Sequence, residues 1–261
     1  MNSVKETIVI KRRRDRIDFP VSNVLKAIAL ANETFEKFSV VNRDLDLFQI
    51  LGMRNLSAFI GEVYVACLKN ASNGLLEKNP HQDGYPDLLL LDPVGLKAYN
   101  SIANKQDKAP FSPFYGGGIE VKATCGSVPT PAQCAKMNVK KPEVGDTRID
   151  LVRGYDWKAH HRETNNLIGI FWDFIQHIPR ITALFYSSDL TQDDWGAIVQ
   201  PHEGGGRTTS VSIMTRAGVR KMAEGCLYCE DDPRVARFLS NYNGLSIASI
   251  LKGVSEELTL L

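Results

Sequence analysis

The sequence predicts a chain of mixed α/β class, with a mixed central β-sheet flanked by helices. Apolar residues near the N-terminus recur at spacings of three and four, as on one face of a helix. Short apolar runs bounded by Gly and Pro, typical of buried strands, follow in the middle of the chain. We expect a single main domain over residues 1–261, with inserted loops around a core at about 57–190.

Composition excludes several classes of protein. The 261 residues are 43% hydrophobic, which is ordinary for a globular core, and the net charge of +1 gives no global basic signature of nucleic-acid binding. Local basic patches can still balance acidic side chains. Five cysteines argue against a secreted disulfide framework. No apolar run reaches the ~18 residues of a membrane span, and the N-terminus lacks a signal-peptide core. We therefore expect a cytoplasmic protein with no membrane partner.

The N-terminal third predicts two helices. It begins with a basic run at 11–16, five cations in six residues, which is either a phosphate-contacting arm or a solvated segment. From Pro20 to about Phe38 the periodicity is that of an amphipathic helix. Ser57 is a good N-cap for a second helix that continues to about Leu68.

Glu62 is the one acid of this second helix. It shares a face with Phe59, Val63 and Ala66. A carboxylate on an apolar face is costly to bury without a cation or hydrogen-bond donors. Glu62 therefore either contributes to a functional site or lies at the exposed edge of the helix.

Two stretches place acidic residues at the ends of apolar strands. The turn-rich loop 79–86 delivers Asp87 to the start of one strand, and a second strand runs from Gly118 to Lys122. Alternation puts Glu120 and Lys122 on one face of the second strand. Two carboxylates are hard oxygen ligands suited to Mg²⁺, and a nearby lysine can act on a water or a phosphate. The simpler alternative is a plain ion pair between Glu120 and Lys122.

Pro86-Asp87 followed by Glu120-Val121-Lys122 resembles the motif of the PD-(D/E)xK nuclease superfamily and, within it, the type II restriction endonucleases. The interval between Asp87 and Glu120 is fairly long. We expect residues 92–95 and 100–117 to be loops inserted between two strands of a hairpin.

The resemblance implies a restriction-endonuclease-like core and a set of roles. Asp87, Glu120 and the Val121 carbonyl would hold Mg²⁺, Lys122 would position or activate the attacking water, and Glu62 would support the site. The family implies a homodimer that cuts both strands of double-stranded DNA at a short recognition sequence and leaves 5′-phosphate ends. Residues 191–261 would then supply DNA-contacting or dimerisation elements.

Residues 138–166 are polar and irregular, with Arg, Lys, His and Asn suited to contacts in a DNA groove and aromatic residues suited to packing there. A Gly-rich loop at 201–210 is either a phosphate-approaching segment or a plain mobile loop. Our candidate DNA-binding residues are Arg153, Lys158, His160, His161, Arg162, Asn165 and Arg207. A metal site at His160 and His161 is disfavoured, because adjacent histidines point in different directions.

The last third predicts two strands, 167–175 and 180–186, whose aromatic residues we place in the core, and a helix over 216–222. Asp173 interrupts the first strand and is either an additional site acid or an edge residue. Cys226 and Cys229 have the spacing of half a zinc site, but buried reduced thiols are the favoured interpretation.

The sequence thus favours a Mg²⁺-dependent, site-specific endodeoxyribonuclease. Two alternatives stay open: a structure-specific repair or junction-resolving nuclease on the same core, and a DNA-binding module without catalytic activity.

Overall fold

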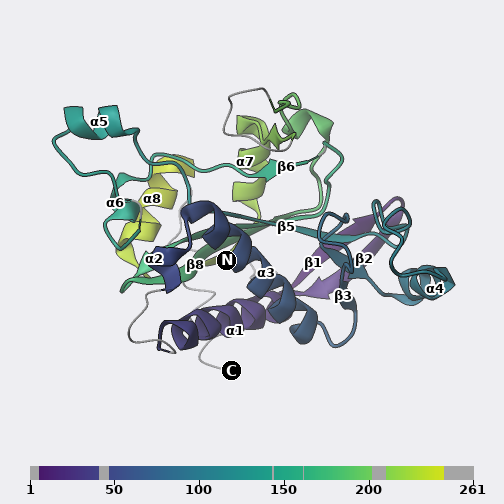
Figure 1. Cartoon of the computed structure of the whole chain (residues 1–261). Coiled ribbons are helices and arrows are strands. Elements are labelled where there is room, and N and C mark those ends of the chain that lie inside the picture. Colours follow the sequence, from purple (N-terminus) through teal and green to yellow (C-terminus); the bar gives the residue numbers. More distant parts are fainter. Residues whose placement is uncertain (1–5, 41–46, 143, 161, 202–209, 244–261) are drawn as a thin grey trace.

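A mixed six-stranded sheet organises the fold (Figure 1). The computed structural model describes residues 6–40, 47–142, 144–160, 162–201 and 210–243. In order across the sheet, the strands are β10 (Cys226–Cys229), β8 (Ile178–Ser187), β7 (Leu167–Ile175), β5 (Gly118–Thr124), β4 (Leu88–Leu90) and β3 (Leu76–Lys78). Only β5 and β7 pair in parallel; the other neighbours are antiparallel. The predicted mixed α/β class, with helices flanking a mixed central sheet, is confirmed.

The two long central strands form where the apolar runs predicted them. Strands β7 and β8 are buried on both faces, which explains why their sequences are nearly continuous in apolar residues instead of alternating. Gln176 and His177 connect them with φ values of 54° and 62°, the backbone of a two-residue hairpin turn. Strand β8 therefore begins at Ile178, two residues before the predicted start. The aromatic side chains of both strands are buried, as predicted.

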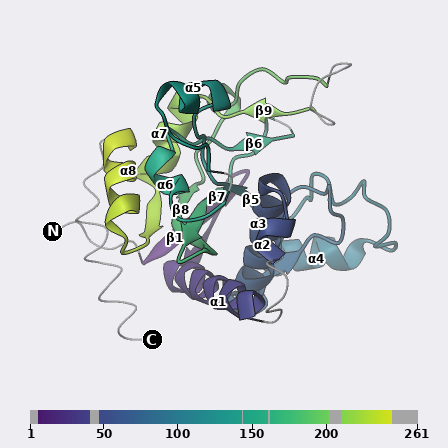
Figure 2. The same cartoon turned by 60° about the vertical axis from the view of Figure 1, so that its left-hand side comes forward.

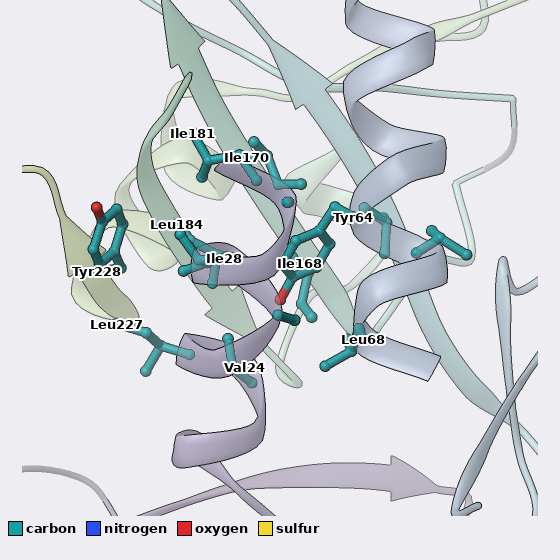
Figure 3. Close-up of a cluster of buried hydrophobic side chains, with 14 of the residues drawn as sticks. Val24, Ile28, Tyr64, Leu68, Ile168, Ile170, Ile181, Leu184, Leu227 and Tyr228 are labelled. Atoms are coloured by element: carbon teal, nitrogen blue, oxygen red, sulfur yellow. The ribbon is translucent and has the colours of Figure 1, made fainter. Parts of the chain in front are cut away.

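Three helices lie on one face of the sheet: α1 (Val21–Val40), α2 (Leu47–Ile50) and α3 (Met53–Ala71). Side chains of α1 and α3 pack against β7 and β8, and Figure 3 shows Val24, Tyr64 and Ile168 among them. The prediction of Ser57 as an N-cap is wrong, because α3 begins one turn earlier, after Gly52. The Ser57 hydroxyl instead accepts a hydrogen bond from the Trp172 indole, at 3.1 Å.

The opposite face is covered by α7 (Arg216–Glu224) and α8 (Pro233–Asn243) together with part of segment 138–166 (Figure 2). This segment contains α6 (Arg148–Leu151) and β6 (Lys158–Ala159), and β6 pairs with β9 (Ser212–Ile213). Its aromatic residues Tyr155 and Trp157 are buried against Phe185. They belong to the core, so the predicted role of these rings at a DNA groove is wrong. The remaining elements are α5 (Pro131–Lys136) and the 3₁₀ turn η1 (Gln192–Asp194).

The insertion between β4 and β5 contains a helix that we did not predict, α4 (Pro93–Ser101). Asp92 is its N-cap, accepting a hydrogen bond from the Gly95 amide, and Pro93 occupies the first helical position. These residues are typical of a helix start as well as of a turn, and the interpretation of 92–95 as a loop is wrong.

The basic run at 11–16 belongs to a hairpin of β1 (Thr7–Arg12) and β2 (Asp15–Pro20). Arg12 is buried and forms an ion pair with Asp92, 2.6 Å away, and Lys11 forms an ion pair with Asp189. Part of this run is therefore used inside the molecule and is not available to a ligand.

All five cysteines are free thiols. Across the described ranges no group of three or more His, Cys, Asp or Glu side chains is arranged to hold a metal ion, which gives no support to a zinc site. No helix among the described residues is both long and apolar enough to cross a bilayer.

Candidate active site

The site forms where β4 stops pairing with β5. Their antiparallel register pairs Leu88 with Ile119, so Asp87 lies just beyond the end of the ladder. There the Asp87 side chain takes the place of a backbone acceptor from β4: Asp87 Oδ2 accepts a hydrogen bond from the Val121 amide at 2.8 Å. In return, the Asp87 amide donates to Glu120 Oε2, at 3.2 Å. Residues from the two sequence stretches are thereby locked together.

Lys122 completes the cluster. Its ammonium lies 2.6 Å from Glu120 Oε1 and 3.4 Å from Asp87 Oδ2. The Glu120 side chain is 6% exposed, whereas Asp87 and Lys122 are 25% and 22% exposed. One ammonium thus faces two carboxyl groups in a half-buried setting, and when both are ionised it compensates only one of the two negative charges. The simple ion pair of Glu120 and Lys122 is present, but it is part of this larger group.

The Val121 backbone is also directed toward the cluster. Within a strand, the N–H and C=O of one residue point to the same side. The Glu120 amide is bonded toward β7, to the Asn166 carbonyl, so the Val121 amide and carbonyl face the opposite edge, where Asp87 lies. The Val121 carbonyl is therefore correctly placed along the strand to join the two carboxylates.

The electrostatic setting perturbs the titration of two groups. Burial, and then repulsion from Glu120, raises the pKa of Asp87 to about 7, although Lys122 and the Val121 amide oppose the shift. Burial lowers the pKa of Lys122, but attraction to Glu120 and Asp87 outweighs it and raises that pKa above the ordinary lysine value. Lys122 therefore carries its proton at neutral pH.

Glu62 lies near this cluster without joining it. Its carboxylate is half exposed and forms an ion pair with Lys78 Nζ at 2.5 Å. Both residues line a cavity of about 300 Å³ that also reaches Asp87, Val121 and Lys122. The helix edge is thus the observed position of Glu62, at the rim of the candidate site.

The loop that carries Asp87 is held by a residue that the sequence analysis missed. Asn79 is buried, and its Nδ2 donates to the carbonyls of Pro86, at 2.9 Å, and Phe111, at 3.0 Å. Its backbone amide donates to the Asp87 carbonyl at 2.9 Å. Asn79 therefore ties Asp87 to the inserted segment. In the sequence Asn79 is one polar residue among several in a turn-rich loop, and nothing there indicates that it is buried.

A second and larger cavity, of about 540 Å³, lies on the other side of Lys122. Lys122, Ala123, Ser57 and His160 line both cavities, so the two adjoin. Lys158 also lines the larger one. Two of the candidate DNA-binding residues, Lys158 and His160, are thus exposed beside the acidic cluster.

The structure does not bring the other DNA-binding candidates to this place. Arg153 is exposed but lines a separate cavity, together with Arg234 and Arg237. Arg162 is half-buried and donates to the Gln192 carbonyl at 2.8 Å. Asn165 is also half-buried and lines neither of the two cavities.

His161 and Arg207 lie outside the described residues. Asp173 is fully buried near the C-terminal end of β7, whereas Glu120 pairs with Leu167 at the N-terminal end of that strand. It therefore occupies neither the cluster nor the sheet edge.

Comparison with known proteins returned no similarity: no family model, no curated protein and no solved structure matches the chain.

Proposed function

We propose that the chain is a Mg²⁺-dependent endonuclease that hydrolyses phosphodiester bonds of double-stranded DNA at a short recognition sequence and leaves 5′-phosphate ends. The observation that carries the proposal is the convergence of Asp87, Glu120 and Lys122, with the ammonium within 3.4 Å of both carboxylates. The motif resemblance to the PD-(D/E)xK nucleases supports it, because the matching residues are the ones that meet.

The donor set fits a hard divalent cation. Asp87 and Glu120 supply carboxylate oxygens, the Val121 carbonyl faces the same edge, and the two ionised acids together carry one more charge than Lys122 neutralises. Two carboxylates and a carbonyl leave coordination positions for water, as Mg²⁺ usually retains. When bound, the cation would supply Lewis acidity toward the phosphate and lower the pKa of a water.

The protein groups would orient and stabilise the reacting atoms. Lys122 lies beside both carboxylates, so its ammonium would donate hydrogen bonds to a water or to the phosphate and thereby position or activate the attacking water. The Val121 amide fixes the Asp87 carboxylate, and the Asp87 amide fixes that of Glu120. Glu62 would act indirectly, by holding Lys78 at the rim.

Dimerisation and a cytoplasmic location belong to the same proposal. A twofold-symmetric homodimer would match a palindromic site and cut both strands. Light scattering on the purified protein tests this part independently of catalysis: a mass near twice the 29.0 kDa of the chain is expected, and a strictly monomeric protein would contradict it.

Phage DNA incubated with the protein and Mg²⁺ tests the activity. Discrete fragments with 5′-phosphate ends, lost on addition of a chelator, are expected. Cutting confined to branched or damaged DNA would favour the repair nuclease instead. Binding without cutting of any DNA would favour the non-catalytic module.

A further inference from the structure

The two adjoining cavities differ in charge, and Lys122 lies between them. Among the described residues, the larger one, here called the basic cavity, is lined by the cations Arg54, Lys122 and Lys158 and by one acid, Asp156. The smaller one, the acidic cavity, is lined by Glu62, Asp83 and Asp87 against Lys78 and Lys122. Counting the charged side chains of the described residues, with histidine neutral and Lys122 included in both, the lining of the first carries a formal +2 and that of the second −1. The whole chain carries only +1, so this is a local concentration of positive charge.

The cations of the basic cavity come from separate elements. Arg54 is in the first turn of α3, and Lys158 is in β6. Figures 1 and 2 both show β5 between these two elements. Arg54 and Lys158 are exposed, and both line the cavity beside Lys122. A chain of phosphates that passes Lys122 would therefore meet cations from two elements on one side of it, and mainly carboxylates on the other.

We propose that the basic cavity binds the nucleic-acid backbone next to the bond that is cut, with Arg54 and Lys158 each contacting a phosphate. Arg54 belongs to no sequence motif, and its role follows only from its place in the cavity wall. The inference deepens the proposed function, because it assigns the side of Lys122 from which the strand enters. A guanidinium and an ammonium suit phosphate oxygens, and such contacts fix register without reading bases.

The contacts predict a specific dependence on salt. Each neutralised phosphate releases condensed counterions, and affinity therefore falls as the salt concentration rises. Loss of one phosphate contact should make the plot of log affinity against log salt less steep, by about 0.9 in absolute slope. We expect the variants Arg54→Ala and Lys158→Ala each to bind a DNA duplex about three- to tenfold more weakly at moderate salt. This loss should be the same for duplexes of different base sequence. Asp156→Asn removes a negative charge from the described wall of the cavity, so it should strengthen binding about two- to threefold.

Fluorescence anisotropy of a labelled duplex in EDTA, over a series of KCl concentrations, measures these effects without any turnover. Arg54→Lys is the conservative control, since it keeps the charge and should retain most of the affinity. Lys37→Ala is the matched control, because Lys37 is a 72% exposed cation that lines neither cavity and is no candidate for DNA binding. Thermal melting of each variant establishes that it is folded.

Loss of affinity and slope in Arg54→Ala and Lys158→Ala, with a gain in Asp156→Asn, would support the inference. Unchanged affinities and slopes would overturn it, as would an equal loss in Lys37→Ala or no duplex binding by the wild type. The proposed activity can fail separately. Salt-dependent binding through Arg54 and Lys158 without cleavage in Mg²⁺ would reject the nuclease activity and retain the backbone-binding site. Cleavage by the wild type together with unchanged binding by the variants would retain the nuclease activity and reject the backbone-binding site.

Discussion

Replacement of Lys122 by Met should separate its structural role from the binding of a cation. The ammonium lies 2.6 Å from Glu120 and 3.4 Å from Asp87, so the variant leaves two carboxylates facing each other. Removal of one partner from a buried ion pair costs about 3–5 kcal/mol. Because Lys122 and Asp87 are still 22% and 25% exposed, solvent screening should reduce this loss to about 2–3 kcal/mol without Mg²⁺.

Mg²⁺ should then stabilise the variant more than it stabilises the wild type. In the wild type Lys122 already contacts both carboxylates, so it competes with an incoming cation. Without it, a cation present at a hundred times its dissociation constant would restore about 2.7 kcal/mol. Cleavage, in contrast, should be abolished.

Thermal denaturation with and without Mg²⁺ measures these changes. A loss of 2–3 kcal/mol corresponds to a fall in Tm of roughly 4–10 °C for a chain of this size. Lys37→Met is the control: Lys37 is 72% exposed and forms a surface ion pair with Glu33, so the Tm of this variant should hardly change. A Lys122→Met protein as stable as the wild type, or equal responses of the two to Mg²⁺, would refute this reasoning.

Three further predictions concern residues around the cluster and in the core. Burial raises the pKa of Asp173 from 3.8 to about 7, so the folded protein keeps a proton that the unfolded chain has lost, and this group's contribution to stability falls between about pH 4 and pH 7. The Asp173→Asn variant should lack that decline, and at pH 8 its free energy of unfolding, measured by urea titration, should exceed that of the wild type by up to about 4 kcal/mol. An unchanged dependence of stability on pH would contradict this prediction. The Asn79→Ala variant should lose about 2–4 kcal/mol of folding free energy and show a smaller Tm shift with Mg²⁺, because the loop that carries Asp87 loses its hydrogen bonds. A Tm shift as large as that of the wild type would contradict the positioning role of Asn79. The buried Tyr64 hydroxyl has no hydrogen-bond partner among the described residues, so Tyr64→Phe should be neutral or stabilising by about 1 kcal/mol in the same titrations, and a marked loss would show an unseen partner.

The sequence predicted the elements whose pattern is local. Helix α1 was found from its 3.6-residue periodicity and β5 from alternation, whereas β7 and β8 were found from apolar runs, because both of their faces are buried. The meeting of Asp87 with Glu120 and Lys122 was predicted by the motif, and the register of β4 and β5 produces it.

The errors concern partners that are distant in sequence. Glu62 looked unpaired on its helix, but its cation, Lys78, comes from β3. The segment around Trp157 looked polar, yet its rings fill the core beneath Phe185. Nothing local distinguishes a surface tryptophan from one that a sheet face covers. Likewise, Asp92 was interpreted as part of a turn because turn and helix-start residues are the same types.

Cleavage of plasmid DNA by matched preparations of wild type, Asp87→Asn and Asp189→Asn tests the central claim most directly. Asp189 is a 68% exposed acid that pairs with Lys11 outside the cluster, so its variant controls for the loss of a carboxylate. We predict Mg²⁺-dependent cutting by the wild type and Asp189→Asn, and none by the folded Asp87→Asn protein. Full cutting by Asp87→Asn, or no cutting by the wild type with any divalent cation, would contradict the account.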